Sequence, residues 1–402
     1  MKYIPRLLEQ AIRRVIARNK SVLLFGARQT GKTTLISRFK AHLVVTLVRP
    51  DVRQRYEKSP QLLAGEVEAL SPPAKSKRPL VVVDEVQKVP ALLDVVQDII
   101  DRGRANFVLT GSSARKLRRG AAVNLLPGRV ATFKLDPFSL REVPVKDVHE
   151  RLLYGSLPGM LAVPDTSDRE TDLESYVTTY LEEEVRAEAL VRQVGDFARF
   201  LELAASESGH IVNLRKLSQE IGVSHTTIGA YYRILEDCLI AERVEPLTHS
   251  KTRKKLTKSE KYLFFDLGVR RLAAREGTKP SRETTGRLFE QFVGLELVRC
   301  AHASRHAFTV RFWRDPDGPE VDWVIDHNGV YTPVEVKWTS TPRPGDIRHL
   351  EIFLAEYPTA KMGYVVCHVP RNTKLSDRVI ALPWQAIDEL IPSDRSRIQR
   401  VK

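Results

Sequence analysis

The chain has 402 residues, 42% of them hydrophobic and 28% charged, and its formal net charge is +14. The length exceeds one ordinary core, so two or three domains are expected, and the composition is that of a globular protein. No stretch approaches the roughly 18 unbroken apolar residues of a membrane span, and the N-terminus lacks the apolar core of a secretory signal. We therefore expect no membrane partner.

Cysteine usage and charge restrict the compartment and the partners. Three widely separated cysteines without metal-ligand spacing favour a reduced, cytoplasmic setting. The excess of positive charge favours a polyanionic partner such as DNA. One basic cluster consists of Arg115, Lys116, Arg118 and Arg119, and a second consists of Lys251, Arg253, Lys254, Lys255, Lys258 and Lys261. Each cluster taken alone is also compatible with a solvated loop.

Residues 21–37, SVLLFGARQTGKTTLIS, combine a buried-strand pattern, a glycine-rich loop and a helix pattern. In a P-loop of this kind the glycines let the backbone N–H groups point at a phosphate, and the following helix aims its positive dipole end at the same anion. Lys32 would bind the β and γ phosphates of ATP, and the Thr33 hydroxyl would ligate Mg²⁺. The predicted ATP-binding residues are Gly26, Ala27, Arg28, Gln29, Thr30, Gly31, Lys32, Thr33 and Thr34.

A second apolar run, from Pro79 to Val83, ends in two acids, Asp84 and Glu85. On a buried parallel strand such acids emerge at the carboxyl edge of the sheet, beside the phosphate loop. Asp84 would hold Mg²⁺ and Glu85 would polarise the attacking water. The acidic pair therefore favours hydrolysis over binding alone.

A third strand begins at Asn106 and ends in hydroxyl side chains, where a sensor of the γ-phosphate would lie. Thr110 is the first choice for this sensor and Ser112 the second. The alternative is a turn followed by a helix cap.

Arg129 precedes a further predicted strand, Val130 to Leu135. An arginine at this place would reach the γ-phosphate of a neighbouring subunit as an arginine finger, which requires a homo-oligomer. The alternatives are a surface arginine and a contact to a DNA phosphate.

The segments GARQTGKTTL, VVVDEVQKVPALL, LTGSSA and LPGRV together resemble one group of AAA+ ATPases of bacteria and archaea. The likeness continues through KYLFFDLG, GRLFEQFVGLEL, FWRDPDGPEVDWVI and PVEVKW, in a domain of unassigned function that usually accompanies this ATPase. The resemblance implies an α/β P-loop AAA+ core over residues 1–140. The helical pattern of residues 141–205 is similar to the AAA+ lid, with Arg186 as a second sensor. Some members of the group are linked to DNA transactions.

Residues 206–275 have the pattern of a winged helix-turn-helix. Apolar positions from Leu214 to Leu235 fit two helices joined at Gly222, and Ser224 would cap the second helix. The exposed face of that helix would include His225, Thr226, Thr227 and Arg233. The basic stretch from Lys251 to Lys261 would supply phosphate contacts to DNA. The alternative is a module that completes the fold and makes interdomain contacts.

Residues 276–402 have the element order of a restriction-endonuclease-like, PD-(D/E)XK, α/β domain. An amphipathic helix (284–300) carrying Glu290 precedes a strand (309–314), a hairpin with its turn at 326–329, a helix and a strand (360–367). Asp322 lies on the first hairpin strand, and Glu335 and Lys337 lie two apart on the second, so the latter two share one face. Asp322 and Glu335 would ligate Mg²⁺, Glu290 would bind the metal or hold a ligand water, and Lys337 would activate water. The alternatives are solvent-facing acids, or a nuclease fold that binds DNA without cutting it.

The sequence therefore predicts an ATP-hydrolysing AAA+ protein that acts on DNA, with Mg²⁺ as cofactor. Its predicted catalytic residues are Glu85, Thr110, Arg129, Asp322, Glu335 and Lys337, and its predicted metal ligands are Thr33, Asp84, Glu290, Asp322 and Glu335. The alternative function is an ATP-controlled regulatory switch whose last two domains only bind partners.

Overall fold

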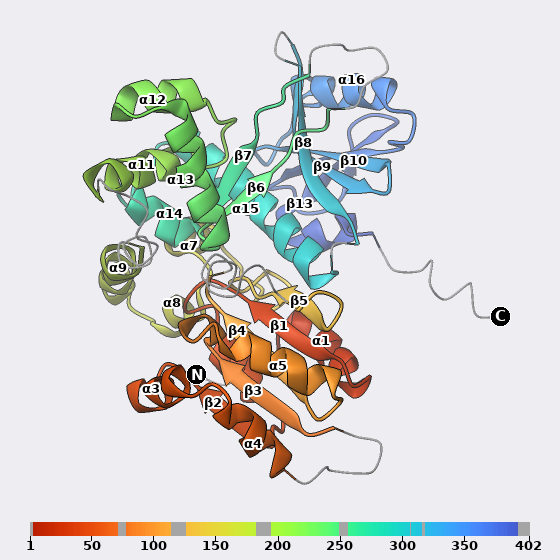
Figure 1. Cartoon of the computed structure of the whole chain (residues 1–402). Helices are drawn as coiled ribbons and strands as arrows, with labels where there is room; N and C mark the ends of the chain where they lie inside the picture. Colours follow the sequence, from red (N-terminus) through yellow and green to blue (C-terminus); the bar gives the residue numbers. More distant parts are fainter. Residues whose placement is uncertain are drawn as a thin grey trace, which may run out of the picture.

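The computed structural model describes residues 3–70, 78–113, 126–181, 194–248, 256–305, 307–315 and 318–392. Figure 1 shows a sheet with its helices in the N-terminal part, a helical region in the middle of the chain and a second sheet in the C-terminal part. In the described ranges no helix combines the length and the apolar character needed to cross a membrane.

The N-terminal sheet is entirely parallel, with the strand order β2-β3-β4-β1-β5. Its strands are β1 (Ser21–Phe25), β2 (Leu43–Thr46), β3 (Leu80–Asp84), β4 (Asn106–Gly111) and β5 (Val130–Lys134). The helices of this part are α1 (Leu7–Ala17), α2 (Lys32–Ile36), α3 (Pro50–Lys58), α4 (Leu62–Glu68) and α5 (Leu92–Asp101), with a 3₁₀ turn, η1 (Val86–Lys88).

Helices cover both faces of this sheet, so its central strands are buried along their length and mostly apolar. Val22 and Leu24 of β1 pack in one cluster with α1 and α2, whereas Leu23 and Phe25 pack in another with α4 and α5. The side chains of β1, β3 and β4 are all buried. Because both faces are buried, the functional side chains emerge at the carboxyl ends of the strands. The predicted α/β class and the parallel core are confirmed.

The middle of the chain is mostly helical. It contains α7 (His149–Tyr154), α8 (Pro158–Ala162), α9 (Thr166–Ser175), a π-helical turn η2 (Tyr176–Leu181), α11 (Val194–Ser206), α12 (Leu214–Ile221), α13 (His225–Asp237) and α14 (Leu267–Ala273). An antiparallel pair, β6 (Ala241–Val244) and β7 (Lys261–Phe264), lies between α13 and α14 in the sequence. Helix α11 packs against α12, α13 and α14.

The turn between α12 and α13 has the geometry that the sequence predicts. Gly222 takes a left-handed conformation with φ 85°, and Ser224 caps α13 by accepting a hydrogen bond from the Thr227 N–H at 3.1 Å. His225 and Arg233 are exposed, and Thr227 is half-buried.

The C-terminal sheet is mixed, with the order β12-β13-β11-β10-β9-β8. Its elements are β8 (Thr309–Arg314), β9 (Glu320–His327), β10 (Val330–Val336), β11 (Gly363–Cys367), β12 (Thr373–Lys374) and β13 (Val379–Pro383), with α15 (Arg282–Ala303), α16 (Arg348–Glu356), η3 (Pro344–Ile347) and η4 (Trp384–Leu390). Strands β9 and β10 form the predicted hairpin, and both turn residues have positive φ, 55° at Asn328 and 82° at Gly329.

Helix α15 differs from its prediction as an amphipathic helix. Nearly every residue from Leu288 to His302 is buried, because the helix contacts β8 and β10 on the C-terminal sheet, β5 on the N-terminal sheet and β7 in the middle of the chain. Figure 1 shows α15 between the two sheets. Its polar residues therefore have buried partners on other elements, which the sequence pattern does not reveal.

Candidate functional site

The loop from Gly26 to Gly31 joins β1 to α2 in a tight turn. A Cβ at Gly26 would lie 2.6 Å from the Leu135 carbonyl oxygen and 2.8 Å from Thr30 Oγ1, so a side chain cannot be added there without moving the loop. Gly31 and Gln29 have φ of 92° and 60°. The turn thus needs glycine at its first position and left-handed conformations later, as a phosphate-binding loop does. Helix α2 begins at Lys32, as predicted, and has only five residues.

Lys32 lies inside this loop with 5% of its side chain exposed. Its ammonium donates to the carbonyl oxygens of Gly26 at 2.8 Å and Ala27 at 3.1 Å, and lies 3.5 Å from Glu85 Oε1. Burial lowers the pKa of Lys32, against the opposing attraction of Glu85 and Asp84. The positive charge of Lys32 thus lies between the loop and the two acids at the end of β3.

Thr33, Asp84 and Thr110 come from three elements and meet at one carboxylate. Thr33 Oγ1 donates to Asp84 Oδ2 at 3.1 Å, and Thr110 Oγ1 donates to Asp84 Oδ1 at 2.5 Å. Thr110 Oγ1 also accepts the backbone N–H of Glu85 at 2.9 Å. The structure therefore brings together the residues predicted for Mg²⁺ binding and for the sensor, and it connects the sensor hydroxyl to both acids. Their chemical roles stay predictions.

Glu85 has a left-handed backbone conformation, φ 60°, which turns its side chain back toward the P-loop lysine. Ser112 Oγ donates to Glu85 Oε2 at 3.0 Å, and the buried Gln87 amide donates to the same oxygen. Burial alone would raise the pKa of Glu85, but Lys32 and these two hydrogen bonds outweigh it and lower the pKa. Glu85 is therefore ionised at neutral pH. Ser112, the second choice for the sensor, contacts Glu85 and not Asp84.

The outer side of the loop is held by two residues that sequence reasoning missed. Arg6 donates to the Thr30 carbonyl oxygen at 2.7 Å, and the Tyr176 hydroxyl donates to the Arg28 carbonyl oxygen at 3.1 Å. Both partners lie far away in the sequence, and no local pattern around Arg6 or Tyr176 indicates the contact.

Arg129 lies at the surface, with 33% of its side chain exposed. It forms a two-point ion pair with Asp101 at the end of α5, with distances of 2.7 and 2.9 Å. Its role as an arginine finger stays a prediction. Arg186, and the basic residues Arg115, Lys116, Arg118, Arg119, Lys251, Arg253, Lys254 and Lys255, lie outside the described residues.

In the C-terminal part, three predicted site residues lie together: Asp322 on β9, Glu335 on β10, and Lys337 directly after β10. Lys337 Nζ is 2.6 Å from Glu335 Oε1, which confirms that these two side chains share one side of the strand. Asp322 Oδ2 accepts the backbone N–H of Val336 at 2.8 Å. Burial, together with the charges of Glu335 and Glu290, raises the pKa of Asp322 well above its ordinary value. Burial also raises the pKa of Glu335, and Lys337 opposes this effect.

Glu290 is held by a lysine for which the sequence predicted another role. Lys261 of β7 is buried, with its ammonium 3.1 Å from Glu290 Oε1 and over the rings of Trp323 (4.9 Å) and Phe312 (5.2 Å). The expectation that Lys261 belongs to an exposed, phosphate-contacting stretch is wrong. The ammonium of Lys261 instead pairs with the carboxylate of Glu290 on α15, 29 residues away in the sequence.

The acidic residues of this region do not form a complete metal site. Within the described ranges, no group of three or more histidine, cysteine, aspartate or glutamate side chains is arranged to hold a metal ion. Of the three carboxylates predicted to bind Mg²⁺, Glu290 is paired with Lys261, and their role as metal ligands stays a prediction. One feature nevertheless fits a cation: Glu335 Oε2 is buried and has no hydrogen-bond partner among the described residues.

Residues 18–144 match the family model of an AAA domain. This match supports an AAA-type ATPase, and such domains typically bind nucleotide with Mg²⁺. The parallel sheet and its P-loop fit the same assignment. Residues 145–280 match a domain of unknown function (DUF8612), and residues 285–387 match another (DUF4143).

Two uncharacterized proteins are similar along most of the chain. They come from Mycobacterium bovis (strain ATCC BAA-935 / AF2122/97) and Mycobacterium tuberculosis (strain ATCC 25618 / H37Rv), and each is 26% identical over 399 residues, covering 94% of this chain and 85% of the relative. Among solved structures, protein VC1899 from Vibrio cholerae is 12% identical and covers 92% of this chain and 91% of its own, with a TM-score of 0.18.

Proposed function

We propose that the protein hydrolyses ATP at the AAA domain and uses this reaction to act on DNA. The observation that supports the ATPase most strongly is the connected set of side chains around Asp84, in which Thr33 and Thr110 donate to one carboxylate while Glu85 contacts Lys32. A structural role alone would not require a buried lysine, two acids and two hydroxyls to meet beside a loop too tight for a Cβ.

The residues around the loop fit a nucleotide with Mg²⁺. Lys32 would bind the phosphates, and Thr33 with Asp84 would hold the metal, since both offer the oxygen ligands that Mg²⁺ prefers. The bound Mg²⁺ supplies charge stabilisation on the phosphate oxygens. Glu85 would orient the attacking water and accept its proton, because its lowered pKa keeps the carboxylate ionised. Thr110 would connect these two functions through its hydrogen bonds to Asp84 and the Glu85 N–H.

The DNA part of the proposal rests on charge and on the arrangement of α12, α13 and the β6–β7 pair. The chain carries +14, and α13 presents His225 and Arg233 on its exposed side. A capped second helix followed by an antiparallel pair is the order of a winged helix-turn-helix, whose second helix enters the major groove. We therefore assign sequence-independent binding of DNA to this region.

The C-terminal part, in this proposal, is a restriction-endonuclease-like domain. The order α15, β8, β9, β10, α16, β11 and the placement of Asp322, Glu335 and Lys337 support it. Asp322 and Glu335 would hold Mg²⁺ together with a DNA phosphate, since Mg²⁺ in such sites often takes only one or two protein carboxylates. Lys337 would orient the attacking water. The ion pair between Lys261 and Glu290 keeps the third carboxylate out of this set in the present conformation.

Arg129 bears on the oligomeric state. Its contacts in the described structure are to Asp101 and the Pro127 carbonyl oxygen at the surface. An action of Arg129 as an arginine finger would therefore be exerted on the γ-phosphate of a neighbouring subunit, which makes a homo-oligomer part of the proposal. Light scattering with and without ATP tests it, and a monomer under both conditions rules the finger out.

The experiment that tests the function is steady-state ATP hydrolysis with and without duplex or branched DNA. We expect hydrolysis that DNA stimulates, and DNA binding that weakens steeply as salt rises. Lys32→Ala should remove both nucleotide binding and hydrolysis. Absence of hydrolysis would refute the ATPase. Hydrolysis without DNA stimulation or salt-dependent DNA binding would instead favour an ATP-controlled regulatory switch.

For the C-terminal site, the measurement is metal-dependent nicking of plasmid DNA. Asp322→Ala and Lys337→Ala should abolish it while ATP hydrolysis continues. Nicking that survives both substitutions would contradict the assignment of this site. If the unmodified protein binds DNA but does not nick it, the function of the domain is to bind DNA and not to cut it.

A further inference from the structure

The orientation of the P-loop peptides is set from outside the loop. The carbonyl oxygens of Gly26 and Ala27 accept from Lys32 within the loop. The other loop carbonyl oxygens need partners outside it, because the backbone N–H groups of a phosphate-binding loop point inward. Two of these carbonyls have such partners: Thr30 O accepts from Arg6, and Arg28 O accepts from Tyr176. The two anchors come from different parts of the chain, Arg6 from the segment before α1 and Tyr176 from the start of η2.

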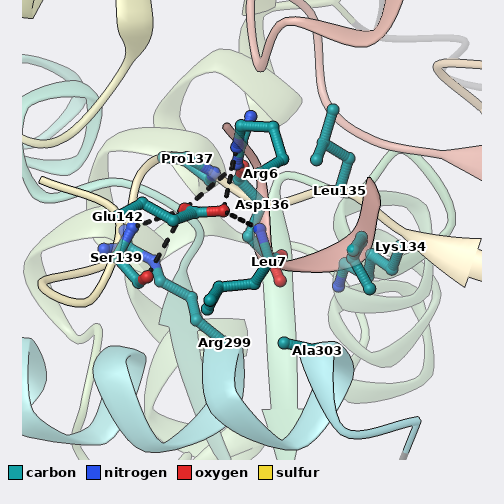
Figure 2. A pocket seen from close by; sticks show the side chains of 11 residues that line it. Arg6, Leu7, Lys134, Leu135, Asp136, Pro137, Ser139, Glu142, Arg299 and Ala303 are labelled. Atoms are coloured by element: carbon teal, nitrogen blue, oxygen red, sulfur yellow. Dashed lines mark hydrogen bonds and ion pairs between the residues drawn. The ribbon is translucent and has the colours of Figure 1, made fainter. Parts of the chain in front are cut away.

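Arg6 has further partners on the segment that follows β5 (Figure 2). Its guanidinium donates to the Asp136 carbonyl oxygen at 2.6 Å and to Glu142 Oε1 at 3.0 Å, and lies over the Phe138 ring at 4.5 Å. Glu142 also accepts the backbone N–H of Leu7 at 2.8 Å. Arg6 is 7% exposed, so these contacts are shielded from solvent. The planar guanidinium therefore connects the P-loop rigidly to residues 136–142.

Residues 136–142 are in turn bound to α15. His302 Nδ1 lies 2.7 Å from Asp136 Oδ2, and Arg299 donates to the Phe138 carbonyl oxygen at 3.2 Å. Glu296 accepts the backbone N–H of Leu140 at 2.8 Å. These three residues of α15 recur every third position and so lie along one side of the helix. The same helix carries Glu290, the partner of Lys261 in the C-terminal site.

We propose that Arg6 is a positioning residue for the P-loop and couples nucleotide binding to the C-terminal domain through α15. This inference rests on the proposed nucleotide function. When phosphate draws the loop N–H groups inward, the Thr30 carbonyl moves with its peptide, and the guanidinium carries this displacement to Asp136 O and Glu142. The Tyr176 hydroxyl anchors the loop at the Arg28 carbonyl oxygen, and its ring packs against Phe265. In this inference Arg6 transmits to α15, and the Tyr176 hydroxyl only positions the loop.

Tryptophan fluorescence gives a selective readout of this coupling. The four tryptophans of the chain, Trp313, Trp323, Trp338 and Trp384, all lie C-terminal to α15, whereas the nucleotide site has none. The non-hydrolysable ATP analogue AMP-PNP, with Mg²⁺, is added to the full chain. Its binding is measured separately by calorimetry. We expect saturating AMP-PNP to change the tryptophan emission of the unmodified protein.

Two substitutions separate positioning from coupling. Arg6→Lys keeps the charge, but its single ammonium nitrogen cannot span the acceptors that Nε, Nη1 and Nη2 of Arg6 reach separately. It should weaken AMP-PNP binding by about tenfold and remove the emission change even at saturation. Tyr176→Phe, the matched control, removes the other anchor. It should weaken binding by a similar or smaller factor, about threefold to tenfold, and keep the full emission change at saturation.

The outcomes distinguish this inference from the proposed function. If calorimetry detects no AMP-PNP binding to the unmodified protein, the nucleotide function itself fails. If AMP-PNP binds and the emission of the unmodified protein does not change, or Arg6→Lys retains the full change at saturation, the coupling is refuted. If Arg6→Lys does not fold, Glu142→Gln decides: a reduced emission change at saturation supports the coupling, and an unchanged one overturns it.

Discussion

His302 provides a quantitative test of the contact between the AAA domain and α15. Its Nδ1 lies 2.7 Å from Asp136 Oδ2, and its Nε2 lies 3.3 Å from Glu242 Oε1. Burial lowers the pKa of His302, and so does the nearby Lys134, but the two carboxylates outweigh both and raise the pKa from 6.5 to about 9. The imidazole is therefore charged at neutral pH and joins β5, β6 and α15 in one buried ionic cluster.

The shift of the His302 pKa determines how much His302 contributes to the folding free energy. Each tenfold change in proton affinity is worth ~1.4 kcal/mol, so the change from 6.5 to about 9 corresponds to ~3 kcal/mol of folding free energy. The side chain is 5% exposed, so solvent screening reduces this little. Because the folded pKa is raised, the contribution is complete below pH 6.5 and is lost as the pH rises through about 9. Between pH 7 and pH 9 the loss should be roughly 2 kcal/mol.

The assay is urea unfolding at pH 6, 7, 8 and 9, followed by tryptophan fluorescence. His302→Gln removes the titrating group, so the difference in unfolding free energy between unmodified protein and variant should shrink by roughly 2 kcal/mol from pH 7 to pH 9. His225→Gln, at an exposed position on α13, is the control and should leave the pH dependence unchanged. A difference for His302→Gln that stays constant over this range would refute the assignment of a charged imidazole.

Three further substitutions test other parts of the molecule. Glu85→Gln should lower the rate of ATP hydrolysis by roughly 10²-fold or more while calorimetry still detects AMP-PNP binding; retained hydrolysis would remove Glu85 from the mechanism. Gly26→Ala places a Cβ 2.6 Å from a backbone oxygen and should abolish nucleotide binding, whereas Gly65→Ala, with open space around it, should bind normally. Lys261→Met frees Glu290 and should tighten Mn²⁺ binding to nucleotide-free protein in electron paramagnetic resonance titrations; unchanged binding would contradict the restraining role of Lys261.

The features that the sequence predicted correctly depend on short-range patterns. The P-loop follows from the order of strand, glycines and helix within about twenty residues, and the hairpin of β9 and β10 follows from Asn328-Gly329 between two alternating runs. In both cases the local backbone requires particular residue types, so the residue types identify the local backbone. The spacing of Glu335 and Lys337 placed them on one side of β10 for the same reason.

The features that could not be predicted from the sequence depend on contacts between residues far apart in the chain. Arg6 and Lys261 are basic residues, for which exposure is the ordinary expectation. The acceptors that bind these two side chains lie 24 to 136 residues away for Arg6 and 29 residues away for Lys261, on elements whose packing the sequence alone does not determine. The same holds for α15, whose polar positions would face solvent on an isolated sheet. They are buried here because residues 136–142 pack against them.

The burial of α15 determines how the two sites can influence each other. Glu290 and His302 are twelve positions apart on one uninterrupted helix, which is ~18 Å along its axis. A buried helix packed on both sheets has little freedom to bend or fray, since each backbone hydrogen bond broken would leave a buried group unpaired. A displacement imposed near His302 therefore moves the helix as a body and reaches Glu290. Glu290 is paired to Lys261, so the displacement acts first on this ion pair. In the proposed function this ion pair keeps Glu290, the third carboxylate, away from the metal.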